Sequence, residues 1–121
     1  MSKTTIEINR LGFFAYHGAT EEEARLGQRF FLDVTLQLVD GLSFAKDDVT
    51  GTVNYAEVYQ VVKASFTYQR FNLIERAAES IAEAVLAGFE LVEEVSVRVE
   101  KPSAPVDCVC DAFAVEISKC R

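Results

Sequence analysis

The alternation of hydrophobic and polar positions divides the chain into four expected strands and two expected long helices. Strict alternation is typical of a strand with one buried face, whereas apolar residues three and four positions apart are typical of a helix. The clearest alternation covers residues 29–39, where every second residue is hydrophobic. The other expected strands are residues 4–14, 93–101 and 109–118, and the expected helices begin at Asn54 and after Phe71.

The stretch Phe71–Glu75 opens the second helix, which we expect to continue to about Phe89. Glu75 lies on the flank of its apolar stripe, and two interpretations of this carboxylate are open. It is either part of a capping box with Asn72, or a ligand anchor that accepts two N–H bonds from one planar group. The apolar stripe consists of Ile74, Ala78, Ile81, Ala82, Val85 and Phe89.

Two other segments begin with a similar pattern of a short polar residue followed by glutamate. Thr20 and Glu23 are spaced as a capping box, which predicts a short helical turn. Asn54 and Glu57 have the same spacing at the start of the first long helix. The polar connector before that helix, residues 40–51, is expected to be fixed to the core by Phe44.

Lys101 ends the third strand on an unexpected face. Its parity places it with Val95, Val97 and Val99 rather than with the polar set. Such a lysine either extends past the apolar face to water or is held in a pocket. Pro102 then ends the strand.

The order strand, strand, helix, helix, strand, strand predicts an α+β fold. Helices placed together on one face of a four-stranded antiparallel sheet satisfy the pattern. Because a short open sheet leaves two bare edges, we expect several copies to associate into a closed oligomer. The length of 121 residues suits one domain over residues 1–121.

Composition and charge limit the kinds of ligand and partner that we expect the protein to bind. A net charge of −7 argues against nucleic acid and against an anionic membrane surface, and favours a small neutral or cationic substrate. The sequence shows neither a secretory signal nor a transmembrane run, so a cytoplasmic location is expected. Three cysteines suggest free thiols in a reducing compartment. Cys108 and Cys110 do not have the spacing of a zinc pair, so no metal is expected.

Four pieces of the chain, taken together, resemble the dihydroneopterin aldolase family. The resemblance runs from about Ile6 to Ile117. It implies the tunnelling fold, in which ββααββ subunits join into a multi-subunit β-barrel, as tetramers or octamers, with sites between neighbours. It also implies a lyase of folate biosynthesis that splits 7,8-dihydroneopterin into 6-hydroxymethyl-7,8-dihydropterin and glycolaldehyde without a metal or organic cofactor. The four pieces are Ala15–Gly18 with Gly27–Gln28, Thr52–Tyr55, Phe71–Glu75 and Val99–Pro102.

The resemblance also implies which residues bind the substrate. Glu75 matches the pterin anchor, which accepts from a ring N–H and the 2-amino group. Leu73 and Ile74 would offer backbone groups to the ring's other edge. Tyr55, with Val53 beside it, matches the contribution of an adjacent subunit that covers the pterin.

Three residues match catalytic positions of the family. Glu23 matches the acidic residue near the substrate's side-chain hydroxyls, Lys101 the catalytic lysine, and Tyr55 a proton donor to the enol-like intermediate. Cleaving a C–C bond beside a hydroxyl needs a base and an electron sink. The pterin's own C=N bond is that sink, so no Schiff base is required.

Two alternatives stay open at this stage. After Pro102 the chain lacks the Pro-Gly turn usual in the family and has residues 104–111 instead, which leaves the balance between cleavage and epimerisation undecided. The first alternative is an epimerase of dihydroneopterin or its triphosphate, although a triphosphate would need a basic cluster that this acidic chain lacks. The second is a pterin-binding ring without turnover. His17 is expected to be structural.

Overall fold

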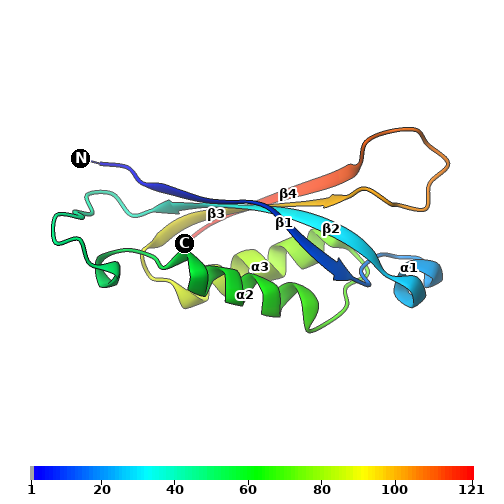
Figure 1. The fold of residues 1–121 in the computed structure, drawn as a ribbon, viewed down its shortest axis with the longest axis horizontal. Coiled ribbons are helices and arrows are strands. Elements are labelled where there is room, and N and C mark those ends of the chain that lie inside the picture. Colours follow the sequence, from blue (N-terminus) through cyan, green and yellow to red (C-terminus); the bar gives the residue numbers. More distant parts are fainter. Residues whose placement is uncertain (1) are drawn as a thin grey trace.

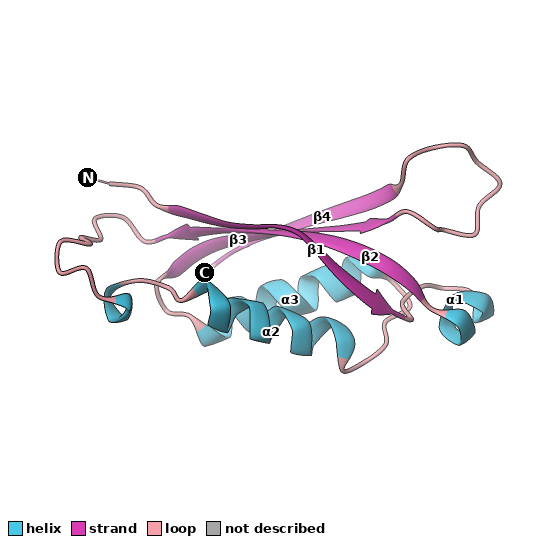
Figure 2. Cartoon of the chain, viewed as in Figure 1, coloured by secondary structure: helices cyan, strands magenta, loops and turns pink. Residues whose placement is uncertain are grey.

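The fold is a four-stranded antiparallel sheet with its helices on one face, seen in a computed structural model that describes residues 2–121 (Figures 1 and 2). The strands lie in the order β1-β2-β3-β4. The predicted α+β class is therefore confirmed. The elements are β1 (Thr5–Ala15), α1 (Glu21–Leu26), β2 (Gln28–Leu38), the 3₁₀ turn η1 (Val49–Gly51), α2 (Tyr55–Thr67), α3 (Ile74–Gly88), β3 (Val92–Lys101) and β4 (Phe113–Cys120).

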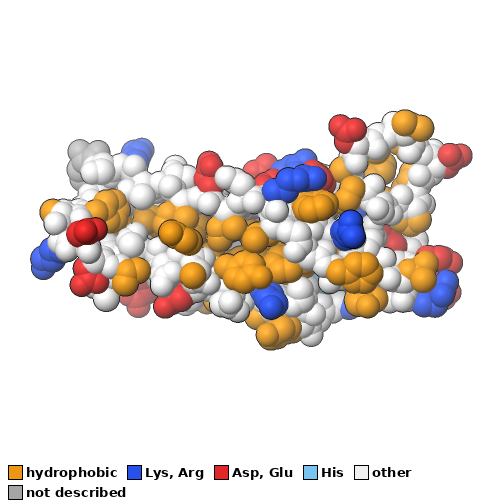
Figure 3. Space-filling model, viewed as in Figure 1, with side chains coloured by type: hydrophobic (Ala, Val, Ile, Leu, Met, Phe, Trp, Pro, Cys, Tyr) orange, Lys and Arg blue, Asp and Glu red, His pale blue; other side chains and the backbone are white. Residues whose placement is uncertain are grey.

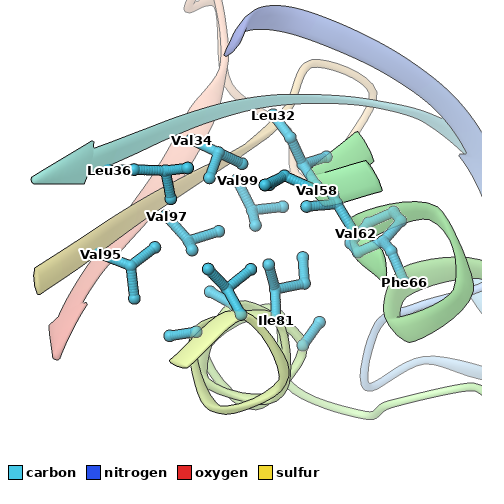
Figure 4. Packing of buried hydrophobic residues seen from close by; sticks show 14 of the residues in the cluster. Leu32, Val34, Leu36, Val58, Val62, Phe66, Ile81, Val95, Val97 and Val99 are labelled. Atoms are coloured by element: carbon cyan, nitrogen blue, oxygen red, sulfur yellow. The ribbon is translucent and has the colours of Figure 1, made fainter. Parts of the chain in front are cut away.

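The core lies between the two central strands and the two long helices. Every second side chain of β2 from Phe30 to Leu38 is buried, as the alternation predicted. The buried valines of β3 stand opposite them in register, with Val97 paired to Val34. Figure 4 shows these side chains meeting Val58, Val62 and Phe66 of α2 and Ile81 of α3.

The start of α3 corrects one sequence-based interpretation. The helix begins at Ile74 with Leu73 as its N-cap, and no side chain caps it. The capping box of Asn72 and Glu75 is therefore wrong. The Asn72 amide oxygen accepts a hydrogen bond from Arg70 Nη1 at 2.8 Å, so a local side-chain contact has taken the group that would otherwise cap the helix.

The other two caps follow the sequence more closely. Thr20 and Glu23 form the predicted capping box at the start of α1. Asn54 caps α2, because its Oδ1 accepts from the backbone N–H of Ala56 at 3.0 Å. Glu57 forms no side-chain hydrogen bond within residues 2–121, so its expected share in that cap is wrong.

The last strand is shorter than expected. It begins at Phe113, so the expected start at Val109 is wrong, and Val109 is fully exposed in the loop before it. Phe113, the first residue of this strand, is 43% exposed, because β4 lies at the edge of the sheet. Phe44, the expected anchor of the polar connector, is also exposed.

Both sheet edges carry apolar side chains that one copy of the chain covers only in part. Hydrophobic side chains gather in a band along the middle of the face shown in Figure 3. Four residues on β1 and two on β4 pack against the core and remain only partly buried. They are Ile6, Ile8, Leu11, Phe13, Val115 and Ile117.

The two ends of the molecule carry different groups. α1, the end of β1 and the start of α3 lie together at one end, whereas η1 and the start of α2 lie at the other (Figure 1). In the part of the chain that the structure describes, no helix has the length and apolarity needed to cross a membrane.

Candidate active site

Glu23 and Lys101 form an ion pair at the end of the molecule that holds α1. Glu23 lies on α1, and Lys101 is the last residue of β3. The distance from Lys101 Nζ to Glu23 Oε2 is 2.7 Å, and the two side chains are only 13% and 6% exposed. Lys101 is thus held at the edge of the core by a carboxylate instead of extending into water.

The Glu23 carboxylate is held by more than the lysine. Its Oε1 accepts from Thr20 Oγ1 at 3.0 Å and from the Thr20 backbone N–H, and its Oε2 accepts from Gln28 Nε2 at 3.0 Å. Burial by itself raises the pKa of Glu23, but the hydrogen bonds from Lys101, Thr20 and Gln28 outweigh it and hold the pKa below its usual value. Glu23 is therefore a charged, fixed acceptor at neutral pH.

Gly18 lies directly against this carboxylate. Its φ of 144° is in a region that side chains rarely adopt. A Cβ placed on Gly18 would stand 2.3 Å from Glu23 Cδ, far inside contact distance. Only glycine at this position leaves room for the carboxylate between Thr20, Gln28 and Lys101.

The Gln28 side chain lies in the site beside Glu23, a position that the sequence alone did not predict. It is 8% exposed, and its Oε1 has no hydrogen-bond partner within residues 2–121. A cavity of about 140 Å³ lies beside it, lined by Glu23 and Gln28 on one side and by Ser103 and Pro105 on the other. The loop that follows Lys101 therefore helps to shape the surroundings of the ion pair.

His17 is buried beneath the same region and is structural, as expected. Its Nδ1 accepts from the Phe71 backbone N–H at 3.0 Å, so the proton is on Nε2, which donates to the Phe66 carbonyl at 2.7 Å. Burial lowers the pKa of His17, and the charges of Arg70 and Lys101 lower it further against the opposing effect of the Phe66 carbonyl. His17 is thus a neutral link between the end of β1 and the start of α3.

Glu75 lies in the first turn of α3 with its side chain exposed. Its carboxylate forms no hydrogen bond or ion pair with residues 2–121, unlike that of Glu23. Leu73, two residues earlier, is 56% exposed, whereas the Ile74 side chain is buried in the core. The structure therefore rules out the capping interpretation of Glu75, and the ligand anchor stays a prediction.

Tyr55 and Val53 lie at the opposite end of the molecule from these groups. α2 and α3 run side by side in opposite directions, and the 13 residues of α2 span about 20 Å (Figure 1). A cavity of about 440 Å³ at the Tyr55 end is lined by Val53, Asn54 and residues 88–91, which follow the end of α3. One chain therefore brings Glu23 and Lys101 together but does not bring Tyr55 to them.

Comparison with known proteins shows the family of the chain. The family description that matches residues 6–118 is dihydroneopterin aldolase, FolB. The chain belongs to the dihydroneopterin aldolase family. A dihydroneopterin aldolase of Methylorubrum extorquens is 44% identical over 116 residues, which are 96% of this chain and 89% of the relative. That of Bacillus subtilis is 37% identical over 114 residues, 94% of this chain and 95% of the relative.

A solved dihydroneopterin aldolase has the same fold. The Escherichia coli enzyme, determined in complex with neopterin, is 26% identical and superposes with a TM-score of 0.85 over 96% of this chain and 98% of its own. Family membership confirms the predicted resemblance and the predicted class of activity, a lyase of folate biosynthesis. Family membership does not by itself assign roles to individual residues.

Proposed function

We propose that this aldolase cleaves 7,8-dihydroneopterin in sites formed between two copies of the chain. One copy would supply Glu75, Glu23 and Lys101, and the other would supply Tyr55 and Val53. The observation that carries the proposal is the buried Glu23–Lys101 pair, which lies at the same end of the chain as the unpartnered Glu75 carboxylate. The neopterin bound to the E. coli relative supports a pterin as the ligand.

Glu75 would fix the pterin ring. An ionised carboxylate can accept two parallel N–H bonds, and the ring N–H with the 2-amino group offers that pair. The backbone groups of Leu73 and Ile74, at the start of α3, would meet another edge of the ring. The exposed Tyr55 ring of the second copy would cover its face.

Lys101 and Glu23 would carry the proton transfers of a retro-aldol cleavage. The side-chain hydroxyl loses its proton to the Glu23 carboxylate, directly or through water, as the C–C bond breaks and glycolaldehyde forms. The electron pair moves into the pterin C=N bond, whose nitrogen takes a proton from Lys101. Tyr55 then protonates the carbon of the enol-like intermediate, and the ring nitrogen returns its proton to Lys101 as the C=N bond re-forms, which completes 6-hydroxymethyl-7,8-dihydropterin. The proton held by Glu23 passes through water to restore the Tyr55 hydroxyl.

Association of copies follows from the same geometry. The bare edges of β1 and β4 and their half-buried apolar side chains would be covered if β1 of one copy paired with β4 of the next. Such pairing, repeated from copy to copy, would close a barrel, of four subunits as the family resemblance implies, and two such rings would stack into eight. It would also place the Tyr55 end of one copy near the Lys101 end of another.

The test is product analysis with 7,8-dihydroneopterin. The wild type, Lys101→Ala and Lys63→Ala are compared, because Lys63 is an exposed lysine of α2 far from the ion pair. Formation of glycolaldehyde by the wild type and the Lys63 variant, with loss of about 100-fold or more in Lys101→Ala, supports the proposal. An epimer without glycolaldehyde would assign an isomerase, and pterin binding without turnover would assign a binding ring.

A further inference from the structure

Two segments far apart in sequence are tied together behind the candidate site. Residues 16–18 follow β1 and lead to α1, and residues 66–72 comprise the last two residues of α2 and most of its connection to α3. Besides the two hydrogen bonds of His17, the Gly18 N–H donates to the Phe71 carbonyl at 3.0 Å. The first segment leads to Glu23 and the second leads to Glu75.

Arg70 holds both segments with one side chain. Its Nε donates to the Tyr16 carbonyl at 2.8 Å, its Nη2 donates to the Gly18 carbonyl, and its Nη1 donates to Asn72 Oδ1 at 2.8 Å. All three acceptors are neutral, and Arg70 has no carboxylate partner within residues 2–121. A surface arginine with only neutral backbone and amide acceptors acts as a clasp, not as half of an ion pair.

Arg70 binds backbone and amide groups close to both carboxylates of the site but forms no hydrogen bond with either carboxylate. Gly18, whose carbonyl Arg70 binds, lies against the Glu23 carboxylate so closely that no Cβ fits between them. Asn72, whose amide Arg70 binds, stands three residues before Glu75 in the segment that opens α3. A shift of Arg70 therefore changes where Glu23 lies relative to Glu75.

We propose that Arg70 is a positioning residue of the aldolase, which sets the spacing between the Glu23–Lys101 pair and the pterin anchor Glu75. This inference rests on the proposed function for the roles of Glu75 and the ion pair. Arginine suits the task because its planar fork donates in several directions at once, whereas a lysine ammonium is a single point on a flexible stem. Displacement of a catalytic group by about 1 Å can cost on the order of 100-fold in rate.

The first experiment compares Arg70→Ala and Arg70→Lys with the wild type in steady-state cleavage of 7,8-dihydroneopterin. Arg25→Ala is the matched control, because Arg25 is an exposed arginine of α1 without a hydrogen bond to residues 2–121. The expected result is a fall in kcat of about 10- to 100-fold in Arg70→Ala, with KM changed by less than about threefold. Arg70→Lys should recover part of kcat, and Arg25→Ala should match the wild type.

Two results would overturn the inference. A loss carried by KM alone would mean that Arg70 binds the substrate. An unchanged kcat in the folded fraction, with only thermal stability lowered, would mean that it is merely structural.

A second readout does not depend on turnover. The Glu23 carboxyl is followed by ¹³C NMR against pH, with Glu23→Gln to assign its signal. Lys101, Thr20 and Gln28 face that carboxyl, so its displacement in Arg70→Ala should raise the pKa of Glu23 above that in the wild type and in Arg25→Ala. The same pKa in all three proteins would refute the positioning role. If the wild type fails to cleave the substrate but the pKa of Glu23 shifts, the proposed function fails and the clasp stands.

Discussion

Lys101 Nζ donates to Glu23 Oε2 at 2.7 Å across 78 positions of sequence, and this contact joins α1 to the end of β3. Both side chains are largely buried, and Thr20 and Gln28 satisfy the carboxylate further. A pair so enclosed is poised for proton transfer with little rearrangement of its surroundings. It also makes α1, a helix of six residues, part of the proposed site.

Substitution of Glu23 and of Glu75 should separate chemistry from binding. Glu23→Gln should lower kcat by roughly 100-fold or more, because the charged acceptor next to Lys101 is lost, and should leave neopterin affinity within a few-fold of the wild type. Glu75→Gln should weaken neopterin binding by about 10- to 100-fold, because a charge-assisted two-bond contact is lost. Fluorescence titration with neopterin and single-turnover cleavage measure the two effects. The opposite pattern would exchange the two roles.

Mixing two inactive variants should restore activity if each site draws on two copies. Tyr55→Ala lacks the group that one copy supplies to the proposed site, and Glu75→Ala lacks the group that the other copy supplies. After the two proteins are unfolded and refolded together in equal amounts, about a quarter of the sites should be intact, because each half is intact in half of the copies. The activity of the mixture is measured against each variant refolded alone. Complete inactivity of the mixture, in oligomers shown to contain both variants, would place both residues in one copy's site.

Acidification should destabilise the fold through His17. Its folded-state pKa lies below the ordinary histidine value of 6.5, so the unfolded chain binds a proton that the folded chain does not as the pH falls below about 6.5. The stabilising contribution of neutral His17 is complete above that pH and is lost progressively below it. Thermal unfolding at pH 7.5 and 5.5 should show a smaller drop in Tm for His17→Phe than for the wild type. Equal drops would mean that other groups dominate the acid response.

Removal of the Arg121 side chain should destabilise the end of α3. Arg121 Nη2 donates to the carbonyls of Leu86 and Phe89 at 2.6 and 2.7 Å, and Nε donates to the Val92 carbonyl at 3.1 Å. Carbonyls at a helix C-terminus lack partners within the helix. Arg121→Ala should therefore lower the free energy of unfolding by roughly 1 kcal/mol. Urea unfolding measures it, with Lys3→Ala as the control, and equal midpoints for the two variants would contradict the expectation.

The elements with strong periodicity were predictable because burial in a shared core dictates their period. β2 alternates over its whole length, and α3 keeps its apolar stripe turned to the sheet. Parity alone also placed Lys101 on the valine face, since side chains alternate along a strand. The capping box of Thr20 and Glu23 was visible for a similar reason, because it is a local contact.

Contacts between distant segments were not predictable from local patterns. Asn72 has the chemistry of an N-cap, but its amide oxygen accepts from Arg70, and Leu73 is the N-cap instead. Arg70 is in turn bonded to the carbonyls of Tyr16 and Gly18, 54 and 52 positions away. Glu23 was open to interpretation as either a cap or a site residue. The structure shows the predicted cap with Thr20 and, in addition, a bond to Lys101 that local sequence does not reveal. The orphan oxygen of Gln28 depends on packing around a residue that looks ordinary in sequence.

In the proposed assembly, the placement of Tyr55 at one end of α2 and of Glu75 at the start of α3 makes each copy a carrier of two unlike halves of a site. A row of copies joined head to tail would leave one unused half at each tip, so that its complete sites number one fewer than its members. Joining the tips of such a row adds the missing site and removes both bare edges of the sheet in the same step. The contact that closes the ring therefore completes the last site, so that both half-sites of every copy belong to a complete site.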